Sequence, residues 1–136
     1  MTPHRFLNPD GLLPGVGFSH VALPAAGQVV HVAGQTAHQP DGSVKGTTMA
    51  EQADAALANL VTALRAAGAE PEHIVAMQLY VTDVSAYRDG LGPIGAAWRA
   101  RLGRHYPAVS LLGVAALFDP AALIEILAIA VIPRTP

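Results

Sequence analysis

The sequence predicts an α+β domain in which two helices cover one face of a β-sheet, in the order β-β-α-β-α-β-β. Three observations support this fold class. Apolar residues recur at helical spacing between residues 53 and 67, residues 72–84 alternate like a strand, and an apolar C-terminal stretch is broken by one Asp-Pro turn. The chain has 136 residues. We therefore expect one domain over residues 1–136, with an irregular N-terminal arm at 1–14.

The first two strands are expected at Phe18–Leu23 and Gln28–Ala33. Both are short β-like runs, and only a Pro-Ala-Ala-Gly segment separates them, which favours a hairpin. The next segment, His38–Ser43, contains an Asp-Gly turn and is expected to form a loop.

The first helix has the clearest pattern in the sequence. Thr48 and Glu51 have the spacing of a capping box at its start, and Gly68 is suited to end it. Its apolar stripe consists of Ala53, Ala56, Leu57, Leu60, Val61, Leu64 and Ala67.

The stretch Glu72–Val84 is expected to be the third strand. One face carries only apolar residues, which indicates burial; these are Val75, Met77, Leu79 and Val81. The other face is expected to carry Ile74, Ala76, Gln78, Tyr80 and Thr82.

A second helix is expected after the Gly90–Gly92 segment, because Pro93 suits the first turn of a helix. Trp98 and Leu102 would lie on its inner face, where a core role is expected for Trp98. Arg99, Arg101 and Arg104 form a basic run near its end, which we interpret as a solvated surface. Two closing strands, Ala108–Ala115 and Leu123–Ile132, complete the pattern.

The composition favours an oligomer. Hydrophobic residues make up 51% of the chain and charged residues only 13%, where about 25% charged residues is typical. Two helices cover one face of such a sheet, so the other face needs a partner. The alternative is that an Ala-rich composition inflates the apolar count.

Several functional classes are disfavoured. The net charge of -2 gives no basic surface for nucleic acid or an anionic membrane. The chain has no cysteine, hence no thiolate nucleophile or thiolate metal site. No apolar run reaches the length of a membrane span, and the polar, proline-rich N-terminus is unlike a signal peptide. We expect a cytoplasmic protein.

Six segments of the chain match, in order, the pattern of a known protein family. These segments are GVGFSHVA (15–22), VVHVAGQTA (29–37), QADAALANLVTALRAAGA (52–69), IVAMQLYVTDVSAY (74–87), YPAVSLLGVAAL (106–117) and IEILAIAV (124–131). The family pattern reads approximately G-P-Y-S-Q-A, then S-G-Q, then Q…N followed by L-x-A-A-G, then P-A-R-S, then I-E-I-E-A-I-A. Over nearly its whole length the chain therefore resembles the RidA/YjgF family.

This resemblance implies a chorismate-mutase-like fold with one mixed sheet, and a homotrimer with small-molecule sites in clefts between its subunits. Archetypal members hydrolyse reactive enamines and imines without a cofactor, releasing a keto acid and ammonia. An Arg after P-A binds the substrate carboxylate, and a Glu on the last strand positions the attacking water. Some members carry ribonuclease or translation-inhibitor labels, but the acidic charge balance argues against nucleic acid here.

The resemblance places a catalytic residue at Glu125 and substrate-binding residues at eight positions. Gly34 and Gln35 match the S-G-Q pattern and Ser110 matches P-A-R-S, but the Arg position is Val109, the Tyr position is Phe18 and the Ser of S-G-Q is Ala33. The Asn expected before the second helix aligns with Leu91, and Leu111 would help Phe18 and Val109 to shape an apolar pocket. The second Glu of the last-strand pattern is Leu127.

These departures predict an altered ligand. Replacing Arg by Val removes a bidentate carboxylate clamp, and two hydroxyl groups are also lost. A small 2-imino acid held by its carboxylate is therefore disfavoured, and a less polar ligand is favoured. An Arg from a neighbouring subunit, such as Arg88 or Arg104, could restore the clamp.

Alternatives remain for the candidate polar residues. Glu125 is either a general acid or base, or a structural carboxylate bonded to a backbone amide or a hydroxyl across an interface. His20, His31 and His38 lack the spacing of a metal site, so we expect no metal and no cofactor.

Three functions remain open from the sequence. The first is a cofactor-independent hydrolase, and the second is a non-catalytic trimer that binds a metabolite or a protein. The third is a biosynthetic step on the same fold, which no residue of the sequence selects.

Overall fold

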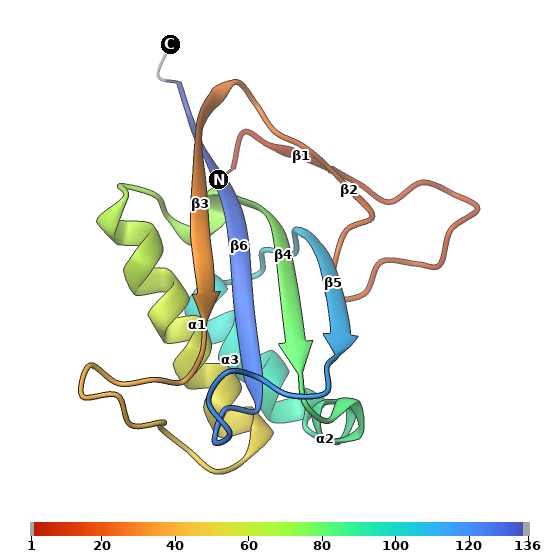
Figure 1. Cartoon of the computed structure of the whole chain (residues 1–136). Helices are drawn as coiled ribbons and strands as arrows, with labels where there is room; N and C mark the ends of the chain where they lie inside the picture. The colour runs from red at the N-terminus through yellow and green to blue at the C-terminus, as the bar shows by residue number, and fades with distance from the viewer. Residues whose placement is uncertain (1, 135–136) are drawn as a thin grey trace.

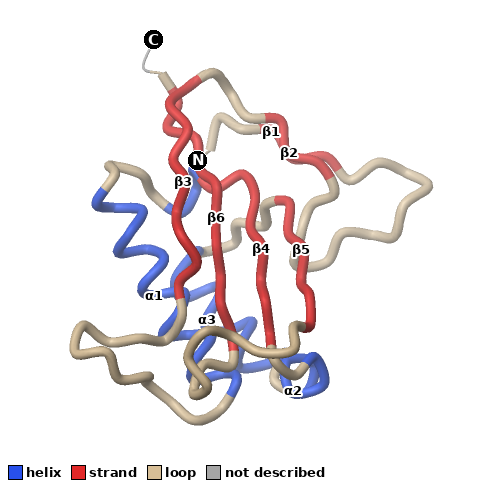
Figure 2. The backbone as a smooth tube through the Cα atoms, in the orientation of Figure 1, coloured by secondary structure: helices blue, strands red, loops and turns tan. Residues whose placement is uncertain are grey.

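A computed structural model describes residues 2–134 of the chain. A four-stranded sheet forms its front layer in Figure 1, and helices α1 and α3 lie behind it. Figure 2 separates the strands, the helices and the long connecting loops by colour. The elements are β1 (Arg5–Leu7), β2 (Val21–Leu23), β3 (Gly27–Gln35), α1 (Met49–Ala66), η1 (Pro71–His73), β4 (Ile74–Val81), α2 (Val84–Asp89), α3 (Leu91–Leu102), β5 (Ala108–Gly113) and β6 (Ile124–Pro133).

The main sheet has the strand order β3-β6-β4-β5. Strand β6 runs antiparallel to both β3 and β4, whereas β4 and β5 are parallel. The sheet is therefore mixed, and its two long helices lie on the same face. This arrangement confirms the predicted α+β fold class.

Helix α1 forms for the reasons that the sequence indicates. The Thr48 side chain accepts a hydrogen bond from the Glu51 amide at 3.2 Å, and the Glu51 carboxylate accepts one from the Thr48 amide at 3.1 Å. These two bonds complete the expected capping box. Its apolar stripe is buried against the sheet, and Leu57, Leu60 and Leu64 are each at most 1% exposed.

The predicted hairpin between residues 18–23 and 28–33 is wrong. Strand β2 pairs with β1 in a separate two-stranded ribbon, with Arg5 opposite Leu23, and β3 pairs with β6. The strand β1 also lies in residues 1–14, where we expected an irregular arm. Beside β6, Val30 and Val32 of β3 pack against the main core, a burial that a two-stranded hairpin would not provide.

A bulge in β4 changes the expected face of one residue. Ile74 pairs with Ala130 and Ala76 with Ile129, so Val75 is an extra residue between two consecutive pairs. The bulge turns Ile74 into the main core, where it is fully buried. From Ala76 onward the predicted alternation is confirmed, because Met77, Leu79 and Val81 are buried in the core.

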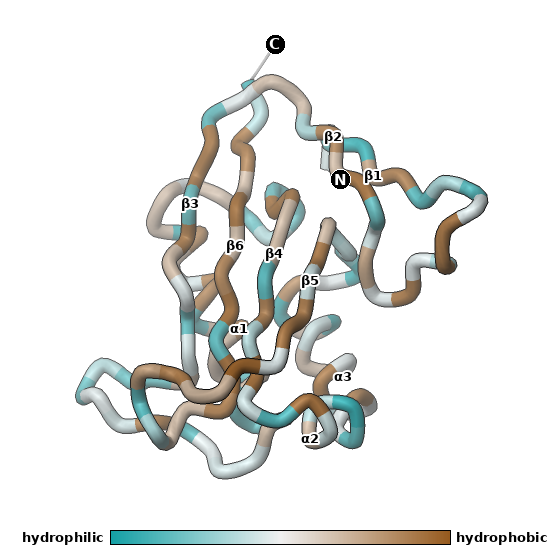
Figure 3. Tube along the Cα trace, turned by 45° about the vertical axis from the view of Figure 1, so that its right-hand side comes forward, coloured by the Kyte–Doolittle hydropathy of each residue, from teal (hydrophilic) through white to brown (hydrophobic). Residues whose placement is uncertain are grey.

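The face of the main sheet opposite α1 and α3 carries no helix of the described chain (Figure 1). This uncovered face includes Val29 and His31 of β3. It also includes Ile129 of β6, which pairs with His31. Val29 is 54% exposed and Leu112 of β5 is 47% exposed. Figure 3 shows long hydrophobic stretches along β5 and β6. Among residues 2–134, no helix is both long and apolar enough to cross a membrane.

Gln52 connects α1 to the loop between β5 and β6. Its side chain is 1% exposed. Its amide nitrogen donates to the carbonyl oxygens of Gly46, at 3.2 Å, and Ala121, at 2.9 Å, and its amide oxygen accepts from the Leu123 amide at 2.8 Å. This buried residue therefore holds the segment that leads into β6.

We expect Gln52→Leu to lower the free energy of unfolding by about 2–3 kcal/mol, because the substitution retains volume but leaves buried backbone groups unpaired. Urea denaturation at fixed protein concentration measures the change. Gln39→Leu is the control, since the Gln39 side chain bonds to Ser43 in an exposed turn. Equal effects of the two substitutions would contradict the structural role of Gln52.

Candidate functional site

Glu125 projects from the uncovered face of the sheet. Its neighbours in β6, Ile124 and Ile126, are at most 1% exposed on the helix side, so the alternation of the strand directs Glu125 to the other side. It lies opposite Tyr80 of β4, whose hydroxyl donates a hydrogen bond to the Gln78 amide oxygen. Glu125 therefore belongs to a small polar group on an otherwise apolar surface.

Gly34 provides the space in which the Glu125 side chain lies. Val32 pairs with Ala128 and Gln35 with Ile126, so Ala33 and Gly34 form a bulge opposite Leu127. A Cβ atom on Gly34 would lie 2.7 Å from the Glu125 Cδ atom and 3.0 Å from Oε2. The carboxylate thus lies directly over the glycine.

The Glu125 carboxylate has no hydrogen-bond or ion-pair partner among residues 2–134. Gln35, which follows Gly34, instead donates its side-chain amide to the Ala33 carbonyl oxygen at 3.1 Å. No cluster of three or more potential metal-ligating His, Cys, Asp or Glu residues occurs in the described chain. The carboxylate is half-buried and available to bond with a ligand, a water molecule or a second copy of the chain.

A second group of predicted residues lines an apolar cavity of about 870 Å³ between β5 and α3. Four of the predicted substrate-binding residues line it, and these are Phe18, Leu91, Val109 and Leu111. Val109 and Leu111 point toward the helix side of the sheet, because they pair with the buried residues Met77 and Leu79. The cavity is large enough for a small metabolite.

Aromatic residues and one cation complete this cavity. The Trp98 and Tyr106 rings stack with their centroids 6.4 Å apart, and the Trp98 indole donates to the His105 carbonyl oxygen at 3.0 Å. Burial raises the pKa of the Tyr87 hydroxyl above its ordinary value of 10.0. Arg99 is the one charged side chain in the described lining. Trp98 belongs to the core, as expected, and also borders the cavity.

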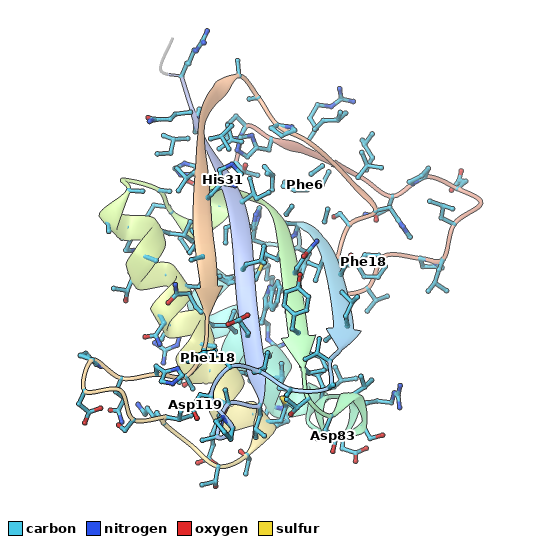
Figure 4. The ribbon with its side chains drawn as sticks, viewed as in Figure 1. Phe6, Phe18, His31, Asp83, Phe118 and Asp119 are labelled. Atoms are coloured by element: carbon cyan, nitrogen blue, oxygen red, sulfur yellow. The ribbon has the colours of Figure 1, made fainter. Side chains whose placement is uncertain are left out.

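The predicted site residues therefore lie on opposite sides of the sheet. Ala33, Gly34, Gln35 and Glu125 gather at the bulge between β3 and β6, and Ser110 of β5 faces the uncovered side opposite Gln78. The four cavity residues lie behind β5. Figure 4 shows Phe18 beside the β5 edge, whereas Phe118 and Asp119 lie near the ends of β3 and β6. One chain leaves Glu125 and Gly34 apart from the cavity residues, whereas Ser110 shares a smaller hollow of about 360 Å³ with Phe18 and Val109 at the edge of the sheet.

The profile of the family described as Endoribonuclease L-PSP matches residues 11–132 of this chain. The chain belongs to the RidA/YjgF family. The Rid-family protein YyfB from Yersinia pestis, whose function is unknown, is 36% identical over 95% of this chain and 98% of its own, with a TM-score of 0.85.

Two further solved structures support this membership. A YjgF-family member from Mycobacterium tuberculosis is 30% identical over 95% of this chain and 99% of its own, with a TM-score of 0.64. RidA from an Antarctic Psychrobacter species is 25% identical over 94% and 99%, with a TM-score of 0.67. No curated protein matches the chain.

In this RidA/YjgF protein, the loop that leads to Glu125 is firmly held. Asp119 accepts a hydrogen bond from the Ala121 amide at 2.9 Å and bonds to His38 at 2.8 Å. Thr36 bonds to the other ring nitrogen of His38. Phe118, next to Asp119, is fully exposed at 105%. The loop thus presents an aromatic ring to solvent from a fixed position.

No sequence pattern predicts this loop network or the position of Arg99 beside the cavity. The sequence predicts a loop that begins at His38 and a turn at Asp119, and nothing that joins the two residues. The other two histidines considered for a metal site lie elsewhere. His20 bonds to the Leu13 carbonyl oxygen at 2.6 Å, and His31 is exposed on the uncovered face. Their long-range partners follow from the fold, and no local motif signals them.

We expect the Asp119 contacts to stabilise the fold at neutral pH and to be lost in acid. The Ala121 amide and the His38 side chain hold the pKa of Asp119 below its ordinary value of 3.8. Because the Asp119 pKa is lower in the folded protein than in the unfolded chain, its contacts stabilise the fold at pH values above the unfolded-state pKa. This contribution to stability is lost as the pH falls through the folded-state pKa.

The measurement is urea denaturation of the wild type and Asp119→Asn from pH 6 down to about pH 2, because the folded-state pKa lies below the ordinary value of 3.8. The wild type should be the more stable protein at pH 6, and the difference should shrink below pH 4. A difference independent of pH would exclude this electrostatic contribution.

Proposed function

We propose that the protein hydrolyses a small enamine- or imine-like metabolite in clefts between the subunits of a homotrimer, without a cofactor. The observation that carries this proposal is the Glu125 carboxylate, which lies over Gly34 with no partner among residues 2–134. A half-buried carboxylate of this kind can accept a proton from a water molecule. The family resemblance assigns a water-positioning role to the same position.

The proposed reaction balances without a redox partner. The oxygen of water forms a bond to the imine carbon while Glu125 accepts a proton from that water. The electron pair of the carbon–nitrogen double bond moves to nitrogen, which takes a proton from solvent, giving a tetrahedral carbinolamine. The proton held by Glu125 then passes to the amino group and the carbon–nitrogen bond breaks. Ammonia leaves as the hydroxyl group releases its proton to solvent and becomes the carbonyl. An enamine enters the same route after protonation at its carbon.

The opposite placement of the two residue groups supports a site shared between subunits. Glu125 and Gly34 would come from one subunit, and the cavity residues Phe18 and Val109 from a neighbour. The apolar uncovered face supplies a surface for such contacts, since Val29 and Leu112 are exposed on it. The exposed Phe118 lies on the loop that leads to Glu125, and a neighbouring subunit would cover it.

Val109 supports a specificity different from that of archetypal members. In the cavity lining, this residue stands where the family pattern has the carboxylate-binding Arg, and it packs against the core as an apolar side chain. A small 2-imino acid would lose its main polar anchor on the β5 wall. A substrate with a larger apolar part would gain contacts with Val109 and Leu111.

A non-catalytic trimer that binds a metabolite or protein is the second candidate. The observation that favours it is the loss of polar groups at Phe18, Ala33 and Val109. Such a protein would bind ligands in the same cavity, but Glu125 would carry out no proton transfer.

We expect Glu125→Gln to reduce imine hydrolysis about 10²–10⁴-fold, because the amide cannot accept a proton from water. Imines are generated in situ by an amino acid oxidase from small and from bulky apolar amino acids, and their decay is followed. Val109→Arg, run in parallel, should shift the preference toward the smallest imino acid. Equal rates in the wild type and Glu125→Gln would refute this mechanism.

We expect Gly34→Ala to impair hydrolysis about 10-fold or more with little loss of stability, since displacement of a carboxylate from its reactive position is costly to catalysis. The new methyl group would meet the flexible end of Glu125, which can rotate away. Thermal unfolding and the hydrolysis assay are compared on the same preparation. Full activity in Gly34→Ala would show that the position of the carboxylate over Gly34 is not required.

A further inference from the structure

Arg99 places a positive charge in the lining of the apolar cavity. It lies on α3, across the cavity from Val109 on β5. One guanidinium nitrogen, Nη1, is 3.4 Å from the position that a Cβ atom on Gly95 would occupy. The side chain therefore lies back along the helix by one turn, over a glycine that itself lines the cavity.

The Arg99 guanidinium has no partner among residues 2–134, which is also true of Arg5, Arg88 and Arg104, whereas two other arginines are paired. Arg101 binds the Asp54 carboxylate through two hydrogen bonds of 3.0 and 3.2 Å, and Arg65 binds Glu70 at 3.1 Å. Arg99 makes no hydrogen bond or ion pair with residues 2–134. Its planar guanidinium, always charged, therefore retains donors for a bidentate bond to a carboxylate.

We propose that Arg99 is a substrate-binding residue that holds the carboxylate of a ligand whose apolar part lies against Val109 and Leu111. The anion-binding position is thereby moved from the β5 wall of the cavity to the α3 wall, within the same subunit. The ligand class is a 2-imino acid, or the corresponding 2-keto acid, with a branched or long aliphatic side chain. The assignment to an imino acid rests on the proposed function, whereas carboxylate binding at Arg99 does not.

This proposal combines two properties of the cavity. Loss of the β5 arginine favours a less polar ligand, and the volume of about 870 Å³ exceeds what the smallest imino acids need. The single cation of the lining still allows a negative charge at one wall. A ligand with one carboxylate and an aliphatic body satisfies both the apolar residues and Arg99.

A binding experiment tests Arg99 without requiring catalysis. Trp98 is the only tryptophan of the chain and lines the cavity, so its fluorescence reports a bound ligand. The probe is 4-methyl-2-oxopentanoate, the keto acid of leucine, and the neutral comparison is 4-methyl-2-pentanone. We expect Arg99→Gln to weaken keto-acid binding about 10- to 100-fold and to leave ketone binding unchanged.

Two further variants make this experiment specific. Arg5→Gln removes the same charge from a residue that is exposed, as Arg99 is, but lies outside the described lining, so it should leave keto-acid binding unchanged. Arg99→Lys retains the charge but lacks the planar fork, and should bind with intermediate affinity. Equal affinity in the wild type and Arg99→Gln, an equal loss in Arg5→Gln, or no binding of the keto acid to the wild type would each overturn the proposal.

The hydrolysis assay separates this proposal from the proposed function. With leucine-derived imine, Arg99→Gln should raise KM about 10-fold or more with a smaller change in kcat. The double variant Arg99→Gln with Val109→Arg should regain activity, with a shift toward small imino acids. If the wild type hydrolyses no imine while keto-acid binding still depends on Arg99, the hydrolase proposal fails and the carboxylate site stands. An unchanged KM in Arg99→Gln would count against the carboxylate site alone.

Discussion

The burial of alternate β6 residues beneath α1 is the constraint on which the rest of the structure depends. Ile124, Ile126, Ala128 and Ala130 are at most 1% exposed, and they meet the leucine stripe of α1. A shift of register by one residue would expose this entire set and bury Glu125 beneath the helix. Core packing therefore fixes the carboxylate on the uncovered face, and the β3 bulge then makes room for it at Gly34.

The same one-sided packing links the core to assembly. Both long helices lie behind the sheet, so the front face retains exposed apolar side chains such as Val29 and Leu112 (Figure 1). The candidate residues divide between this face and the cavity behind β5. In the trimer that we propose, one set of contacts would both cover the apolar face and complete the site. Stability and function would then depend on the same interface.

Charges are few in this RidA/YjgF protein, so the placement of each one is informative. Asp119, Asp54 and Arg101 all have partners that hold loops or helices together. Glu125 and Arg99 have none among residues 2–134, and they mark the two candidate walls of the site. YyfB, 36% identical and itself of unknown function, adds strong support for the fold and none for the substrate. Fold membership and chemistry thus rest on different observations.

The sequence by itself determined the local elements and the identity of the candidate acid. The capping box and apolar stripe located α1, the alternation located β4, and the family resemblance of residues 124–131 singled out Glu125 as the candidate acid. Only the tertiary structure decided that β2 pairs with β1 and not with β3, that a bulge turns Ile74 inward, and that the exposed Arg99 borders the cavity. Helical and strand periods are local properties of a chain. Strand partners and cavity walls depend instead on which distant segments bury each other best, and no local pattern encodes that choice.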